Sequence, residues 1–210
     1  MRFILASQSP ARRNVLRQAG IDPVVVVSGV DEDAITESLP DASHQELVTA
    51  LAQAKAEAVV RMVEHPDAVI VACDSMLSIG GEILGKPGTP ERARQRWATM
   101  AGNQGELLTG HAVVRLDGGK VTATAKDWES TVVRFAKPTE AELAAYIAGG
   151  EPLEVAGGFT IDGRGGWFVD SIDGNASSVI GISLPLTRRL LAEVGLSVID
   201  LWLDEAGQQA

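Results

Sequence analysis

The first residues that could do chemistry form the motif Ser7-x-Ser9-x-x-Arg12-Arg13, where a short apolar segment meets a helical one. The free N–H groups of a first helical turn attract anions, and arginine side chains add donors that fit phosphate oxygens. The alternative is an ordinary capped helix with two solvated arginines. Arginine in a first turn opposes the helix dipole, and this cost tips the interpretation slightly toward phosphate binding.

A second motif, Cys73-Asp74-Ser75, follows an apolar run that begins at Ala68. Buried parallel strands have this composition, and their carboxyl ends carry ligand sites in α/β proteins. A carboxylate there can hold a divalent cation or accept a proton from water, which makes Asp74 the strongest catalytic candidate. The alternative is that Asp74 caps a turn. Cys73 is interpreted as a buried strand residue and not as a nucleophile, because no histidine belongs to its motif.

A third motif, Gly80-x-x-x-x-Gly85-Lys86-Pro87, matches the start of a phosphate-binding P-loop. Pro87 stands where a P-loop needs Ser or Thr to reach magnesium, so a P-loop ATPase is excluded. Lys86 is either a point charge that meets a phosphate or a solvated lysine.

Three further features are ambiguous on their own. The run Asp31-Glu32-Asp33 could ligate a metal, although an acidic turn is the favoured interpretation. Lys55 lies inside a long helical segment, where it would usually belong to the polar face. Five glycines between residues 157 and 166 either admit a ligand close to the backbone or permit tight turns between strands.

The elements that must position these residues alternate between strands and helices. We expect strands at residues 2–6, 23–28, 68–73, 106–116 and 121–135, and a hairpin at 76–84 that turns at Gly80 and Gly81. We expect helices at about residues 10–19, 43–62, 90–100, 139–148 and 185–194. The expected N-caps are Ser9, Ser43, Thr89 and Thr139, and the last residues, 205–210, are expected to fray. The fold class is therefore α/β, with a mixed twisted sheet and flanking helices.

Composition narrows the class of protein further. The 210 residues include 28 acidic and 18 basic side chains, a net charge of −10, which fits one domain over residues 1–210 or two lobes sharing a core. This charge disfavours binding to nucleic acid polymers. A lone cysteine and three dispersed histidines exclude an internal disulfide and a zinc motif. The short apolar N-terminus and the lack of ~18 consecutive apolar residues predict a cytoplasmic protein with no membrane segment.

Taken in order along the chain, these motifs resemble the Maf family of nucleoside triphosphate pyrophosphatases, formerly described as septum-formation inhibitors. The resemblance runs from about Phe3 to Leu196 and is carried by the segments ILASQSPARRNVL, VDEDA, LAQAKA, ACDSMLSIGGEILGKP, LLTGHAVV and YIAGGEPLEVAGGFTIDGRGGWFVDSIDGNASSVIGISLPL. It implies a fold related to the inosine triphosphatase type, with two lobes around a nucleotide cleft. It also implies hydrolysis of a nucleoside triphosphate to the monophosphate and pyrophosphate, with a divalent cation, Mg²⁺ or Mn²⁺, and a possible homodimer.

The resemblance also implies roles for individual residues. Asp74 would accept a proton from the water that attacks the α-phosphorus, and Glu32 would lie near the metal together with Asp74. The residues that would line the triphosphate site are Ser9, Arg12, Arg13, Lys55 and Lys86.

Three positions concern the choice of base, and they are occupied here by Ala11, Ser75 and Asp162. The family members that prefer dTTP and UTP show Arg, Thr and Gln there, and those that prefer 7-methyl-GTP show a bulky residue, Gln and Glu. This sequence matches neither group. Asp162 is acidic like the Glu of the second group, whereas Ser75 carries a hydroxyl like the Thr of the first. The preferred base therefore stays open.

Two other functions compete with this one. The first is a nucleotide-binding regulatory or interaction protein in cell division with vestigial hydrolysis, and the chemically competent residues at every site position count against it. The second is a nucleotidyltransferase, for which 210 residues show no additional acceptor-binding domain.

Overall fold

The structure is a computed structural model that describes residues 1–202, so the predicted fraying of residues 205–210 lies outside the described residues. The strands are β1 (Arg2–Leu5), β2 (Val24–Val25), β3 (Ala68–Ile79), β4 (Glu82–Leu84), β5 (Gln104–Asp117), β6 (Lys120–Phe135) and β7 (Val169–Asp173). The helices are α1 (Pro10–Gln18), α2 (Glu32–Glu37), α3 (His44–Val60), α4 (Pro90–Met100), α5 (Glu140–Ala148), α6 (Ala176–Ile180) and α7 (Leu184–Glu193). Short 3₁₀ segments are η1 (Glu151–Glu154), η2 (Ala156–Gly158), η3 (Arg164–Phe168) and η4 (Val198–Leu201).

The strands form one mixed sheet, which confirms the predicted fold class. Its order is β2-β1-β3-β5-β6-β7, and β4 pairs with β3 outside this path. Strand β1 runs parallel to both β2 and β3, whereas β4 and β7 are antiparallel to their partners. The two-residue turn at Gly118 and Gly119, both with positive φ, joins β5 to β6 as an antiparallel hairpin.

The chain divides into two compact units. The first unit contains residues 1–74 and 110–128 and the described residues from 181 onward, and the second contains residues 75–109 and 129–180. Strands β3, β5 and β6 each contribute residues to both units. No helix among residues 1–202 is both long and apolar enough to cross a membrane.

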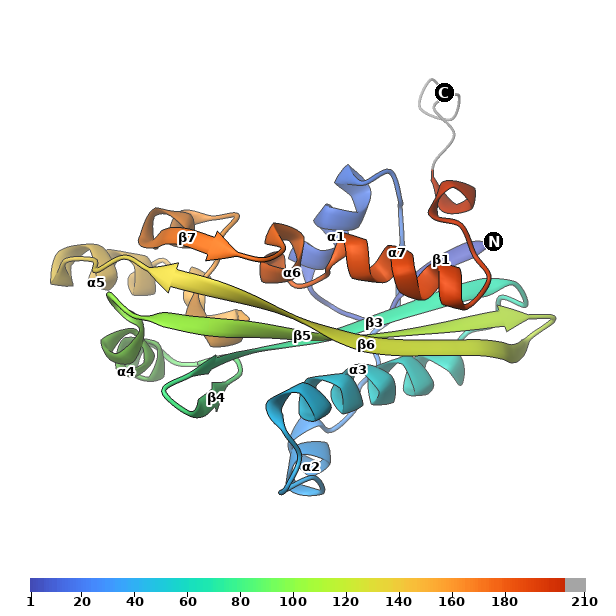
Figure 1. Cartoon of the computed structure of the whole chain (residues 1–210), viewed down its shortest axis with the longest axis horizontal. Coiled ribbons are helices and arrows are strands. Elements are labelled where there is room, and N and C mark those ends of the chain that lie inside the picture. Colours follow the sequence, from blue (N-terminus) through green and yellow to red (C-terminus); the bar gives the residue numbers. More distant parts are fainter. Residues whose placement is uncertain (203–210) are drawn as a thin grey trace. The chain divides into compact units, whose positions relative to one another are not determined.

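In the first unit, α3 covers one face of the strands, and α1 and α7 lie on the opposite face (Figure 1). The small side chains of Ala52 and Ala56 on α3 pack with Ile4 and Ile70 in a buried aliphatic cluster. Gly110 on β5 permits this close packing, because a Cβ there would lie 2.2 Å from the carbonyl oxygen of Val48 on α3.

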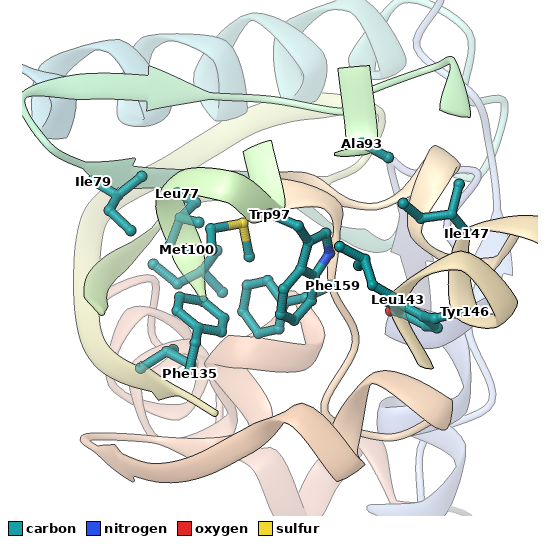
Figure 2. Packing of buried hydrophobic residues seen from close by; sticks show 12 residues of the cluster. Leu77, Ile79, Ala93, Trp97, Met100, Phe135, Leu143, Tyr146, Ile147 and Phe159 are labelled. Carbon is teal, nitrogen blue, oxygen red and sulfur yellow. The ribbon is translucent and has the colours of Figure 1, made fainter. Parts of the chain in front are cut away.

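The second unit is built around Trp97 of α4, which is fully buried. Figure 2 shows its indole among the aromatic and aliphatic side chains of this cluster. The ring makes edge-to-face contacts with Phe135 at 5.8 Å and Tyr146 at 6.0 Å, measured between centroids. Its Nε1–H donates to the Gly158 carbonyl oxygen at 2.9 Å. This hydrogen bond satisfies the indole N–H, which is buried together with the ring.

The predicted helix starts are confirmed. Ser9, Ser43, Thr89 and Thr139 are the N-caps of α1, α3, α4 and α5, and α3 and α5 begin with complete capping boxes. The predicted hairpin turn also forms, with positive φ at Gly80 and Gly81.

Four local predictions are wrong. The strand expected at 23–28 is only Val24–Val25, and the acidic turn expected at Asp31-Glu32-Asp33 is the start of α2, capped by the Asp31 side chain. The glycine-rich stretch 157–166 was expected to join strands. It includes residues of the 3₁₀ segments η2 and η3 and lies between α5 and β7, and β7 is a strand that the sequence did not predict.

The fourth error concerns Asp74. The strand expected to end at Cys73 continues to Ile79, so Asp74 lies inside β3 and not at its carboxyl end. Aspartate disfavours strands, which is why the sequence pattern placed a boundary there. Because Asp74 lies within a strand, the alternative that it caps a turn is also wrong.

Candidate active site

The loop between β1 and α1 holds Arg12 in a fixed position. Ser9 caps α1 by accepting the Arg12 backbone N–H at 3.4 Å, and Ser7 Oγ accepts from Arg12 Nη1 at 3.0 Å. Arg12 Nε donates to the carbonyl oxygen of Gly181 at 2.7 Å. Arg12 is therefore anchored at the helix start, and the solvated-arginine alternative does not describe it.

Arg13 is the second cation of this motif. Its Nε atom is buried and has no hydrogen-bond partner among the described residues. An unsatisfied buried donor costs on the order of 1–3 kcal/mol, and an anionic ligand would remove that cost. Ala11 precedes this pair on α1 and is half-buried.

A buried ion pair joins β3 to α3. Lys55 Nζ lies 2.6 Å from Asp74 Oδ1 and 2.8 Å from Glu32 Oε1 on α2. The side chains of Lys55 and Asp74 are 10% and 7% exposed, whereas that of Glu32 is 51% exposed. The ammonium group thus bridges two carboxylates, one enclosed and one open to solvent.

The second carboxylate oxygen of Asp74 has no such partner. Asp74 Oδ2 is buried and accepts no hydrogen bond from any described residue. Burial raises the pKa of Asp74 above its ordinary value, although the positive charges of Lys55 and Arg12 act in the opposite direction. A carboxylate with one oxygen held and the other free is suited to accept a proton.

Cys73 directly precedes Asp74 on β3. The residue is fully buried, and burial raises the pKa of its thiol to about 12. A thiol with this pKa is not ionised at neutral pH, which agrees with the interpretation of Cys73 as a structural residue.

Asp74 and Glu32 offer oxygen donors of the kind that a divalent cation prefers. Magnesium is commonly held by one or two carboxylates together with substrate phosphates, and the free Asp74 Oδ2 fits that role. No group of three or more His, Cys, Asp or Glu side chains within residues 1–202 is arranged to hold a metal. A bound cation would therefore take its remaining ligands from substrate oxygens and water.

The remaining predicted site residues belong to the second unit. Ser75 Oγ lies 3.0 Å from Thr109 Oγ1, which also donates to the carbonyl oxygen of Ser178 at 3.3 Å. Lys86 is exposed on the loop after β4, and Asp162 is exposed between η2 and η3. The structure thus brings Lys55, Asp74 and Glu32 together, whereas it describes Ser75, Lys86 and Asp162 within another unit.

Sequence reasoning missed Arg96, which supports the loop that carries Lys86. Arg96 Nη1 donates to the carbonyl oxygen of Gly85, and Nη2 donates to that of Lys86 at 3.3 Å. No sequence signal could have found this contact, because it depends on how α4 packs beside the loop.

Fold and site together define an α/β protein with an arginine-bearing helix start and a buried aspartate paired with a lysine. The chain belongs to the family described as Maf-like protein, whose model matches residues 2–194. The family predicted from the sequence is thereby confirmed.

Curated relatives cover nearly the whole chain. A protein of Saccharopolyspora erythraea named nucleoside triphosphate pyrophosphatase is 66% identical over 205 residues, covering 96% of this chain and 97% of that protein. A protein of Nocardia farcinica with the same name is 60% identical, covering 95% of this chain and 96% of its own. The name of these relatives agrees with the hydrolase class predicted from the sequence.

A comparison with solved structures found the Ham1 protein of Staphylococcus aureus. It is 16% identical, with a TM-score of 0.41, and the match covers 65% of this chain and 72% of that one.

Proposed function

We propose that this protein hydrolyses nucleoside triphosphates to the nucleoside monophosphate and pyrophosphate by attack of water at the α-phosphorus. The observation that carries the proposal is Asp74, a buried carboxylate with Oδ1 on Lys55 and Oδ2 unpartnered. Asp74 Oδ2 takes a proton from water as the water oxygen bonds to the α-phosphorus. The bond from that phosphorus to the bridging oxygen breaks, and pyrophosphate leaves with the electron pair.

The cations of the site offset the charge of the triphosphate. A chain with a net charge of −10 repels such a substrate at long range, so binding must come from local donors. Arg13 offers its unsatisfied Nε, and Arg12 and Ser9 lie beside the first N–H groups of α1. Lys55 holds Asp74 in place, and Lys86 adds a point charge.

Asp74 and Glu32 are the residues that would hold a divalent cation, Mg²⁺ or Mn²⁺. When bound, such a cation supplies charge neutralisation at phosphate oxygens and favours loss of a proton from water. The free Oδ2 of Asp74 supports this assignment, and the exposed carboxylate of Glu32 can reorient toward a ligand.

Ala11, Ser75 and Asp162 are proposed to select the base. The exposed Asp162 carboxylate can accept hydrogen bonds from a guanine or cytosine edge. Ala11 is too small to obstruct a large base. The chain therefore takes a nucleoside triphosphate whose base is to be found by experiment.

Product analysis tests the proposal. Purified protein is incubated with a panel of canonical and modified triphosphates, with Mg²⁺ or Mn²⁺, and pyrophosphate and orthophosphate are measured separately. We expect stoichiometric pyrophosphate and monophosphate from at least one substrate. Release of orthophosphate alone would contradict the proposal, and binding without turnover across the panel would favour the regulatory function in cell division.

A further inference from the structure

A pocket lies entirely within the second unit. It has a volume of about 570 Å³ and is bounded by the end of β6, by α5 and by η3. Its wall includes Lys137, Tyr146, Arg164, Trp167 and Phe168, none of which belongs to the site proposed for hydrolysis. Pockets of 300–1,000 Å³ typically accept ligands of the size of a nucleotide.

Trp167 gives this pocket a flat aromatic surface. The residue is 86% exposed, which is unusual for so large an apolar group. The next residue, Phe168, is fixed in the core by edge-to-face contacts with Trp97 at 5.9 Å and Tyr146 at 5.6 Å. The backbone under Trp167 is therefore anchored while its indole stays available for stacking.

Two cations face the same pocket. Lys137 and Arg164 are both exposed, and Arg164 lies over the end of α5, where a Cβ at Gly149 would come within 2.8 Å of its Nη1. The carboxylate of Glu142, also in the wall, already accepts from the Thr139 N–H at 2.7 Å and from its hydroxyl at 2.8 Å. The wall therefore holds two cations and one carboxylate, and the charge of Arg164 also acts on the nearby Glu151 carboxylate, so Lys137 and Arg164 serve the pocket as local hydrogen-bond donors and not as a strongly positive patch.

We propose that this pocket binds a nucleoside monophosphate or a ligand of the same chemistry, a flat heterocycle joined to a phosphate. The ring would stack on Trp167, and the phosphate would be held by Lys137 and Arg164. The pocket is a second nucleotide site, and the inference does not rest on the proposed hydrolysis.

Tryptophan fluorescence of the full chain tests the site directly. A Trp128→Phe/Trp202→Phe protein keeps Trp167 as its exposed indole, because Trp97 is buried. Adenosine 5′-monophosphate in the presence of a metal chelator is expected to quench this fluorescence saturably. Adenosine and inorganic phosphate, each lacking one half of the ligand, should bind about ten-fold more weakly or not at all.

Calorimetric titration with adenosine 5′-monophosphate then locates the site. Trp167→Ala and Arg164→Ala should each lower the affinity about ten-fold or more, at an unchanged melting temperature. Trp128→Ala is the matched control, since Trp128 is exposed but lies in the first unit. Arg13→Ala, which alters the proposed triphosphate site, should leave the saturable quenching of Trp167 unchanged, and this separates the pocket from that site.

Three results would overturn the inference. The first is no saturable quenching at millimolar ligand, and the second is equal loss of affinity in Trp128→Ala and Trp167→Ala. The third is a concentration-dependent dimer that Trp167→Ala abolishes in sedimentation, which would assign the surface to a second copy of the chain.

Discussion

At the scale of single residues, the proposed chemistry depends on Asp74. Asp74→Asn keeps the shape of the side chain but removes its charge and most of its basicity. If Oδ2 is the proton acceptor, kcat should fall by about 10²–10⁴. Steady-state kinetics, with melting temperature as the check on folding and the exposed Asp170→Asn as the control, measures the effect. Retention of more than about a tenth of parental kcat would remove Asp74 as the base.

Lys86 is exposed, so its replacement should change catalysis without changing the stability of the fold. If Lys86 meets a substrate phosphate as proposed, Lys86→Ala removes one charge-assisted hydrogen bond, worth roughly 1.5–3 kcal/mol. We expect kcat/KM to fall about ten-fold to a hundred-fold at an unchanged melting temperature. Lys120→Ala, which removes another exposed lysine, should have no effect. A change of less than about two-fold in Lys86→Ala would identify a merely solvated lysine.

At the scale of elements, Glu151 ties η1 to the loop before η3. Burial alone would raise the pKa of Glu151, but hydrogen bonds from Thr160 and from the Gly165 N–H, with the charge of Arg164, lower it below 4.5. A lowered folded-state pKa stabilises the protein above pH 4.5, and this stability is lost as the pH falls through the folded-state value.

Glu151→Gln should therefore lower the melting temperature by about 2 °C at pH 7, because the residue is only half-buried and solvent screens part of its charge. The difference in melting temperature between the parent protein and Glu151→Gln should shrink as the pH is lowered below about 4.5. Thermal unfolding across this range measures it, with the exposed Glu154→Gln as the control. A difference that is the same at every pH would show that the charge of Glu151 is not responsible.

Gly110 determines how closely α3 approaches the sheet, and α3 carries Lys55. In Gly110→Ala the new Cβ would meet the Val48 carbonyl oxygen at 2.2 Å, and neither backbone can move freely. The expected loss of stability is about 3 kcal/mol, or a fall in melting temperature of about 6–12 °C. Gly85→Ala, where nothing lies within 4 Å of the added Cβ, is the control. Equal melting temperatures for the two variants would contradict the packing described for α3.

At the scale of the whole molecule, local signals predicted the elements well and their contacts poorly. Ser43 and Glu46 predicted the start of α3, because a capping box is encoded within four residues. Residue patterns alone assigned Lys55 to a polar helix face, whereas it is buried against Asp74, 19 residues away. That pairing depends on the packing of α3 against β3, and the family resemblance implied only that Lys55 lines the triphosphate site, not that it pairs with Asp74. Arg96 and the pocket beside Trp167 carried no sequence signal at all.

Hydrolysis in water enriched in oxygen-18 tests the central claim most directly. Attack on the α-phosphorus places the labelled oxygen on the nucleoside monophosphate, because the bond from that phosphorus to the bridging oxygen is the one that breaks. Mass spectrometry of the separated products should therefore find the label in the monophosphate and none in pyrophosphate. Label found solely in pyrophosphate would show attack at the β-phosphorus and contradict the role given to Asp74.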